Sequence, residues 1–118
     1  MTAESQRKTW ETYASSWSEM NPARRLGLFG ECLQTDCVYA DPAVQVMGFE
    51  HLASYMVEVS TKVPGVRFIT TAFVAHHGQS LAHWNMVRGD GQVVSQGASY
   101  ARYGADGKLL QMSGFFAT

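Results

Sequence analysis

The sequence has few charged residues and no cluster of one sign. Charged residues make up 16% of the 118, and nine basic and ten acidic side chains leave a net charge of about −1. Surfaces that bind nucleic acid depend on clustered lysine and arginine. We therefore expect no nucleic-acid partner. Runs of like charge, which are typical of disordered interaction tails, are also lacking.

Long apolar runs are missing as well. None approaches the length of about 20 residues that a helix needs to cross a bilayer. The first residues, Met1 to Lys8, are polar and lack the apolar core of a secretion signal. We expect no membrane association, and a cytoplasmic location is the default.

Metal-binding patterns are not found either. The two cysteines, Cys32 and Cys37, are five positions apart, which fits no zinc or redox motif. His76 and His77 end a predicted strand, and His51 lies on the polar side of a predicted helix. No HExxH pattern or third spaced ligand accompanies them. We expect reduced thiols rather than a disulfide between the two cysteines, no metal site and no cofactor.

The chain has the size and composition of one globular domain, residues 1–118, with 46% apolar residues. Its first half has helical periodicity. Trp10, Tyr13 and Trp17 follow the spacing of one helical face. Asn21-Pro22 is a helix start, with a capping side chain followed by proline at the first helical position.

Two further elements complete the predicted first half. Leu26, Phe29 and Leu33 mark the buried face of the second helix, which we expect to end near Gln34-Thr35. A short strand follows from Cys37 and ends in the Asp41-Pro42 turn. After Gly48 a third helix is expected, ending before Pro64-Gly65 because the residue before proline disfavours the helical region.

The second half predicts a sheet. β-branched and aromatic residues dominate four segments, separated by short turns rich in glycine and aspartate. These segments are 66–76, 80–88, 92–103 and 108–116. Short turns join neighbouring antiparallel strands, so a meander is expected, and helices followed by a meander give an α+β fold. Both strand faces carry large apolar side chains, as Phe115 beside Phe116 shows. One face can pack on the helices, and a homodimer partner would cover the other.

The chain resembles the nuclear transport factor 2-like superfamily, most closely its SnoaL-like and ketosteroid-isomerase-like members. The resemblance covers nearly the whole chain and rests on the order of Tyr13 and Trp17, Arg24-Arg25, Tyr39-Ala40-Asp41-Pro42, Gly48, Pro64-Gly65, Trp84, Gly97, Asp106-Gly107-Lys108 and Gly114-Phe115-Phe116. It implies a cone-shaped, curved antiparallel sheet packed against three N-terminal helices and enclosing an apolar pocket, also described as a cystatin-like α+β roll. Such proteins include isomerases, polyketide cyclases, dehydratases, epoxide hydrolases and non-enzymatic binding proteins, so the fold does not settle function.

Asp41 is the main catalytic candidate. It matches the general base of the ketosteroid isomerases, an aspartate followed by proline at the end of the first strand. An apolar cavity disfavours the charged form of a carboxylate, which makes it a better base for removing a proton beside a carbonyl. Alternatively, Asp41 belongs to an Asp-Pro turn and accepts hydrogen bonds from nearby backbone amides.

Two more positions are compared with the isomerases. Tyr13 matches their oxyanion-hole tyrosine, although as part of an apolar helical face it could simply pack in the core. Ser99 stands where the isomerases have a protonated aspartic acid, the pairing known for that enzyme. A serine hydroxyl is a weaker donor, and this departure argues against steroid isomerase activity.

His83 has two possible orientations. It shares one strand face with Asn85, while Ala82, Trp84 and Met86 share the other. Facing inward, His83 could form an acid–base pair with Asp41 near neutral pH. Facing outward, it would lie at the dimer face.

A set of aromatic and methionine side chains could form the wall for a hydrophobic ligand, although such residues also build plain cores. With Ser99, this predicted substrate-binding set is Trp17, Tyr39, Met47, Tyr55, Met56, Phe68, Trp84, Met112 and Phe116. The leading hypothesis is a small dimeric enzyme that transfers a proton on an apolar carbonyl or cyclic metabolite, as isomerases, cyclases and dehydratases do. The alternative is a non-catalytic protein that binds a hydrophobic small molecule in the same cavity.

Overall fold

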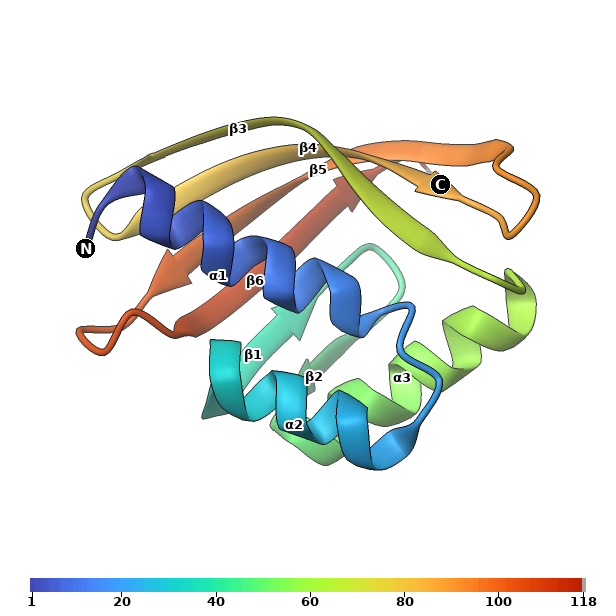
Figure 1. Ribbon diagram of the computed structural model, residues 1–118, viewed down its shortest axis with the longest axis horizontal. Coiled ribbons are helices and arrows are strands. Elements are labelled where there is room, and N and C mark those ends of the chain that lie inside the picture. The colour runs from blue at the N-terminus through green and yellow to red at the C-terminus, as the bar shows by residue number, and fades with distance from the viewer. Residues whose placement is uncertain (118) are drawn as a thin grey trace.

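Three helices and six strands make up the computed structural model, which describes residues 1–117 (Figure 1). The helices are α1 (Ala3–Ser16), α2 (Pro22–Cys32) and α3 (Phe49–Lys62). The strands are β1 (Leu33–Ala40), β2 (Gln45–Met47), β3 (Arg67–His76), β4 (Gln79–Val87), β5 (Val93–Tyr103) and β6 (Leu109–Phe116). The α+β class and the three N-terminal helices predicted from the sequence are confirmed.

Local sequence signals explain where the helices begin. Thr2 and Ser5 form a reciprocal capping box at the start of α1. The Asn21 side chain accepts from the backbone N–H of Arg24, and Pro22 occupies the first turn of α2. Gly48 precedes α3 with a φ of 83°, a left-handed conformation that favours glycine.

The strands form one sheet in the order β2-β1-β6-β5-β4-β3. The meander predicted for the second half is confirmed, because β3, β4, β5 and β6 pair antiparallel in sequence. The fully antiparallel sheet was wrong in one pair, since β1 runs parallel to β6. The chain leaves β1, passes through α3 and the meander, and returns beside β1 in the same direction. β2 was not predicted because three residues are too few to show alternation.

The second helix differs from its prediction. α2 ends at Cys32, and Leu33 begins β1 instead of extending the helix to Gln34-Thr35. Leu26 is 44% exposed, so the predicted buried face was wrong by one residue. Arg25 is buried in its place, and its Nε donates to the backbone oxygen of Ser16 at 3.1 Å. This hydrogen bond to α1 lets a charged residue take an inward position that apolar periodicity would not assign to it.

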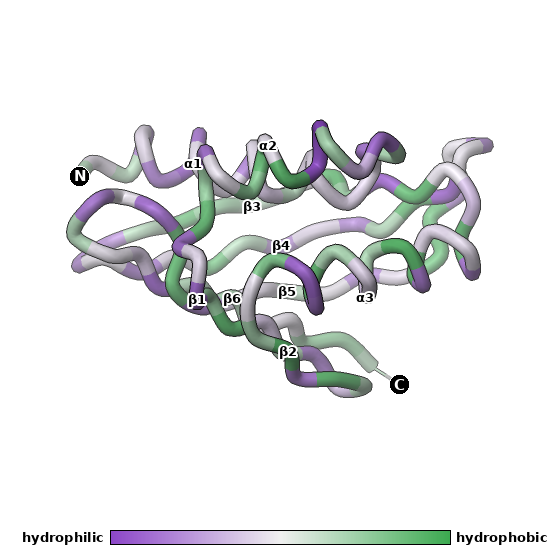
Figure 2. The backbone as a smooth tube through the Cα atoms, turned by 90° about the horizontal axis from the view of Figure 1, so that it is seen from below, coloured by the Kyte–Doolittle hydropathy of each residue, from purple (hydrophilic) through white to green (hydrophobic). Residues whose placement is uncertain are grey.

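The helices cover the inner face of a curved sheet. In Figure 1, β3 and β4 arch over α1, while α2 and α3 close the opposite side. α1 contacts both β3 and α2, and α3 contacts α2, β1 and β2. Figure 2 shows that both the helices and the strands contain apolar segments. Cys32 and Cys37 lie buried between them as free thiols, and burial raises the pKa of Cys37 to about 11.

The other face of the sheet carries large exposed apolar side chains. Phe115 on β6 is 63% exposed and Val74 on β3 is 64% exposed. Ile69 and Leu81 are exposed as well. In the register of the sheet, Phe115 stands opposite Ala98, and Leu81 stands opposite Val74. No helix of the described residues covers this outer face.

A glycine allows the largest inward side chain of the sheet to pack. Trp84 on β4 pairs with Gly97 on β5. A Cβ atom at position 97 would lie 2.5 Å from a ring atom of Trp84 and 2.6 Å from the backbone oxygen of Phe115. The indole therefore occupies the space that any other residue would fill at position 97.

We predict that Gly97→Ala destabilises the fold. The new methyl group must displace either the Trp84 ring or the backbone of β6, and overpacking of this kind costs on the order of 1–3 kcal/mol. Denaturant unfolding measures the change in the free energy of unfolding. Gly30→Ala is the matched control: a Cβ there has no neighbour within 4 Å. Because alanine also favours the helix, this variant should be neutral or more stable by about 0.5–1 kcal/mol. Equal effects of the two substitutions would contradict the prediction.

Candidate functional site

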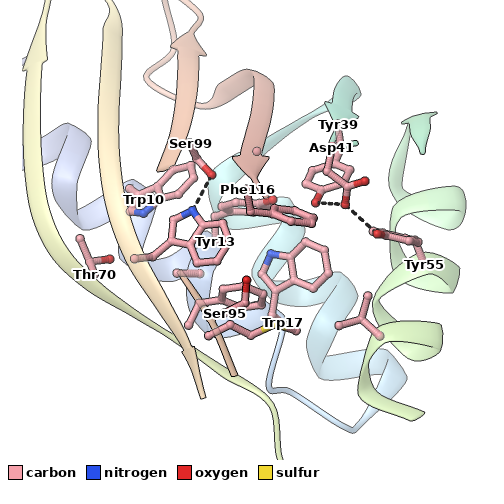
Figure 3. A pocket seen from close by; sticks show the side chains of 16 residues that line it. Trp10, Tyr13, Trp17, Tyr39, Asp41, Tyr55, Thr70, Ser95, Ser99 and Phe116 are labelled. Atoms are coloured by element: carbon pink, nitrogen blue, oxygen red, sulfur yellow. Dashed lines mark hydrogen bonds between the residues drawn. The ribbon is translucent and has the colours of Figure 1, made fainter. Parts of the chain in front are cut away.

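A cavity opens between the helices and the inner face of the sheet. It measures about 650 Å³ including its open mouth. Figure 3 shows side chains from α1, α3 and the strands converging on it. Its lining residues are Trp10, Tyr13, Ala14, Trp17, Tyr39, Asp41, Tyr55, Val59, Phe68, Thr70, Trp84, Met86, Ser95, Ser99, Gly114 and Phe116. Eight of these side chains are aromatic, and Asp41 is the one charged residue among them.

Trp17 is the centre of the aromatic lining. Its ring lies 5.5 Å from that of Tyr39, 6.0 Å from that of Tyr55 and 5.3 Å from that of Phe68, measured between ring centroids. The rings meet at steep angles, which is a favourable geometry for aromatic pairs. Phe68 continues the contact to Trp84 at 5.2 Å, and Trp84 to Phe116 at 6.0 Å. One chain of touching rings therefore joins α1 to the sheet.

The Asp41 carboxylate accepts four hydrogen bonds. Its Oδ1 accepts from the backbone N–H groups of Ala43 at 2.8 Å and Val44 at 3.1 Å. Its Oδ2 accepts from the hydroxyls of Tyr39 at 2.7 Å and Tyr55 at 2.6 Å. The Asp-Pro turn expected as one alternative is therefore present at Oδ1. The second oxygen belongs to the cavity, where both tyrosine hydroxyls point at it (Figure 3).

No basic side chain neutralises Asp41. Within residues 1–117 the ion pairs are Arg24 with Glu19 and Arg88 with Asp90, both on the surface. All four donors to Asp41 are neutral groups. They stabilise the ionised carboxylate without cancelling its charge. The cavity wall therefore carries one full negative charge.

The tyrosine hydroxyls of the cavity are held in their protonated form. Burial is the largest cause of a raised pKa at Tyr39 and Tyr55, and the hydrogen bond and charge of Asp41 add to it. Burial also raises the pKa of Tyr13, with an opposing contribution from the neighbouring Trp17. These groups act as hydrogen-bond donors over the whole neutral pH range.

A second polar pair lies on the sheet side. The indole Nε1 of Trp84 donates to Ser99 Oγ at 3.0 Å, which leaves the serine proton free to be donated elsewhere. Gly114 on β6 lies between this pair and the carboxylate. A Cβ atom there would be 3.7 Å from Ser99 Oγ, 3.7 Å from Asp41 Cβ and 3.8 Å from the Tyr39 hydroxyl. Ser99, Asp41 and Tyr39 thus converge on one point.

Most of the residues predicted for the site meet in the cavity. Asp41 and Tyr13 line it, together with Trp17, Tyr39, Tyr55, Phe68, Trp84, Ser99 and Phe116. Three methionines do not. Met56 and Met112 are fully buried in the core, and Met47 is 60% exposed on β2. The flexible side chains of Met56 and Met112 fill the packed core instead of bordering the cavity.

His83 does not face the cavity. The inward positions of β4 are Ala82 and Trp84, both buried, so His83 points to the outer face and is exposed. The predicted inward orientation of His83 was therefore wrong, and His83 does not pair with Asp41. The bulk of Trp84 decides the face, because its indole fits only over Gly97.

Seven lining residues were missed from the sequence: Trp10, Ala14, Val59, Thr70, Met86, Ser95 and Gly114. Some were recoverable. Met86 follows Trp84 by two positions and Thr70 follows Phe68 by two, so they share a strand face with predicted residues. No sequence pattern indicated that Gly114 lines the cavity, because it has no side chain and only leaves space there.

Residues 1–117 contain neither a membrane-spanning helix nor a cluster of metal ligands. No helix within residues 1–117 is long and apolar enough to span a membrane. No group of three histidine, cysteine, aspartate or glutamate side chains in that part of the chain could hold a metal ion.

We predict that alkaline pH destabilises the fold through the tyrosines. Burial raises the pKa of Tyr103 to about 12, and those of Tyr13, Tyr39 and Tyr55 are raised as well. Between the ordinary pKa of about 10 and these higher values the folded state binds more protons than the unfolded state. The contribution of the tyrosines to the free energy of unfolding should therefore be constant below about pH 9 and be lost as the pH rises above about 10. The buried thiols of Cys32 and Cys37, whose pKa values are raised as well, should add to this loss.

Spectrophotometric titration provides the measurement. At about pH 11 the tyrosinate absorbance of the folded protein should be less than half that of the unfolded chain, because four of the five tyrosines are raised. If all five tyrosines ionise near pH 10 while the protein stays folded, the prediction that burial keeps four of them protonated is wrong.

Solved structures share this fold. No protein-family model matches the sequence, and the search of curated proteins found no significant relative. A suspected isomerase of the SnoaL-like family from Agrobacterium tumefaciens superposes with a TM-score of 0.88 at 24% identity, over 98% of this chain and 99% of that one. An NTF2-like protein of unknown function from Exiguobacterium sp. 255-15 superposes with a TM-score of 0.73 at 15% identity, over 92% and 98%.

A third structure contains a ligand. This hypothetical protein from Catenulispora acidiphila, of ketosteroid isomerase-like fold, was solved in complex with trimethylamine. It superposes with a TM-score of 0.75 at 14% identity, over 92% of this chain and 85% of that one. At these identities the likeness is one of fold. The fold of this chain is that of the nuclear transport factor 2-like proteins, including SnoaL-like and ketosteroid isomerase-like ones.

Proposed function

We propose that the cavity is the substrate site of a small enzyme that transfers a proton on an apolar carbonyl or cyclic metabolite, with Asp41 as the base. One observation carries the proposal. The cavity-side oxygen of Asp41 accepts from two protonated tyrosine hydroxyls, Tyr55 at 2.6 Å and Tyr39 at 2.7 Å. A base and two hydrogen-bond donors are therefore held at one place in an apolar wall, as proton transfer beside a carbonyl requires.

The geometry supports a specific exchange of hydrogen bonds. A bound carbonyl oxygen accepts the Tyr55 hydroxyl in place of Asp41 Oδ2, which frees a lone pair on the carboxylate. That lone pair takes the proton from the carbon next to the carbonyl. The C–H bond breaks, its electrons move to the carbonyl oxygen, and Tyr55 stabilises the resulting enolate. Returning the proton to another carbon completes an isomerisation, and expelling a leaving group completes a dehydration.

Tyr55 and Tyr39 take the donor role in this proposal. The resemblance to isomerases gave that role to Tyr13 and left Ser99 without an acid. Tyr13 has no hydrogen bond to Asp41, and its ring packs 5.0 Å from Trp10. Ser99 keeps a proton available for the substrate, because its oxygen accepts from Trp84. Tyr13 and Ser99 therefore act as secondary contacts to the substrate.

Binding without turnover is the second candidate, and the full hydrogen bonding of Asp41 favours it. Four donors already occupy the carboxylate, so one of these hydrogen bonds must break before Asp41 can take a proton from a substrate. The trimethylamine bound by the Catenulispora acidiphila protein adds small amines to the candidate ligands of this cavity. In both candidates residues 1–118 act as one domain.

We predict that the protein catalyses hydrogen exchange at the carbon next to a ketone. In deuterated buffer, NMR would follow the loss of the α-hydrogen signals of cyclohexanone and 2-decalone. The wild type should exceed the buffer rate. Asp41→Asn should reduce the catalysed rate by about a hundredfold or more, since the amide cannot accept the proton, while ketone affinity is kept.

The control for this assay is Glu11→Gln, which removes one negative charge from the exposed side of α1. Its exchange rate should equal that of the wild type. If the ketones bind but exchange no faster with the wild type than with Asp41→Asn, turnover is rejected and binding without turnover is the better proposal.

We also propose a homodimer through the outer face of the sheet. This face exposes Phe115, Val74, Ile69 and Leu81, and a partner would bury them. His83 lies on the same face, as expected for its outward orientation.

The dimer is tested by sedimentation at micromolar concentration. The wild type should have twice the 13.0 kDa mass of one chain. Phe115→Lys should give a monomer, because it places a charge in the apolar interface. Val57→Lys, on the exposed side of α3 away from this face, should remain a dimer. A monomeric wild type would contradict the proposal.

A further inference from the structure

The cavity contains one negative charge with no positive partner. Among residues 1–117, Asp41 is the only charged residue of the lining, and the ion pairs lie elsewhere. A neutral apolar ligand would shield this carboxylate from solvent without supplying an opposite charge. Such desolvation of an ionised group is costly unless an opposite charge compensates for it. The charge balance of the wall therefore favours a ligand that carries a positive charge.

The rest of the lining attracts cations as well. Three tryptophans, three tyrosines and two phenylalanines border the cavity. The π faces of aromatic rings are negative and attract cations, with tryptophan the most effective and tyrosine next. Trp17 and its neighbours Tyr39 and Tyr55 lie within 6.0 Å of one another and beside the carboxylate. The charge and the aromatic faces thus act at the same end of the cavity.

The hydrogen bonds of Asp41 narrow the kind of cation. Primary ammonium and guanidinium groups carry several N–H donors, which need free acceptor oxygens. Both oxygens of Asp41 are already occupied, by two backbone N–H groups and two tyrosine hydroxyls. A quaternary ammonium has no N–H donor and a tertiary one has a single N–H, so neither needs the several free acceptors that a primary ammonium needs, and their alkyl groups pack on aromatic rings. It gains from the field of the carboxylate while Tyr39 and Tyr55 keep their hydrogen bonds.

We infer that the ligand of this cavity carries a tertiary or quaternary ammonium group, seated against Trp17, Tyr39 and Tyr55 with Asp41 as its counter-ion. The inference rests on the proposed use of the cavity as a ligand site, and it narrows the proposed substrate to a carbonyl or cyclic metabolite that also carries such an ammonium group. It does not depend on turnover, since a substrate and a merely bound ligand would meet the same wall.

The test compares two probes of equal shape, choline and its uncharged analogue 3,3-dimethyl-1-butanol, by titration followed by protein NMR. Choline should bind the wild-type protein at least tenfold more tightly than the alcohol. Ethanolamine, which has a primary ammonium, should bind at least tenfold more weakly than choline. Added salt should weaken choline binding and leave the alcohol unchanged, because mobile ions screen only the charged pair.

Two substitutions that each remove one negative charge assign the effect to Asp41. Asp41→Asn should reduce choline affinity at least tenfold and change affinity for the alcohol less than twofold. Glu11→Gln, on the exposed side of α1, should change neither. Should Asp41→Asn fail to fold, the comparison of probes on the wild type still decides the question.

The outcomes separate this inference from the proposed function. If the alcohol binds as tightly as choline, or if Asp41→Asn leaves choline affinity unchanged, the inference of a cationic ligand is refuted. The proposal that the cavity binds a ligand is then unaffected. If ethanolamine binds as tightly as choline, the methylated class is refuted. If neither probe nor the cyclic ketones bind, both the inference and the proposed ligand site are refuted.

Discussion

The Asp41 carboxylate joins the end of β1 and the turn that follows it to α3. Its four hydrogen bonds reach Tyr39 at the end of β1, the backbone of the following turn and Tyr55 on α3. Hydrogen bonds to a charged group are about twice as strong as neutral ones. This one side chain therefore fixes how α3 meets the end of β1. The position of α3 in turn determines where the cavity opens.

Aromatic side chains keep the cavity from closing. A cavity lined by flexible aliphatic chains tends to be filled by their alternative rotamers. Aromatic rings have few rotamers, and the rings around Trp17 support one another at 5.3 to 6.0 Å. Methionines, which adapt readily to irregular spaces, are found in the solid core at Met56 and Met112. The cavity wall is therefore mainly aromatic, and within residues 1–117 Met86 is its one methionine.

Much of the fold could be predicted from the sequence, because its signals are local. Asn21-Pro22 and Gly48 mark helix starts, and turns rich in glycine separate the strands of the meander. The parallel pairing of β1 with β6 could not be predicted, since the two strands are far apart in the chain. The inward position of Arg25 depends on one hydrogen bond to the backbone of Ser16, which sequence periodicity does not record.

The site was predictable in part. Resemblance to a known family identified Asp41, and periodicity identified most aromatic residues of the wall. The partners of Asp41 could not be found this way, because Tyr55 meets it only after α3 packs on β1. The orientation of His83 also required the sheet, where the fit of Trp84 over Gly97 determines which face points inward. Contacts within an element are recorded in the sequence, whereas contacts between elements depend on packing.

The absence of a side chain at Gly114 sets the size of the polar end of the cavity, and a single added carbon would reduce it. The missing side chain leaves room among Asp41, Ser99 and Tyr39, each less than 4 Å from where a Cβ would be. These distances are ordinary van der Waals contacts, so a methyl group could be accommodated there without moving the sheet. A side chain at this position would shorten the polar end of the cavity. Proteins with the same carboxylate and the same rings could thus separate long ligands from short ones by the presence or absence of one methyl group.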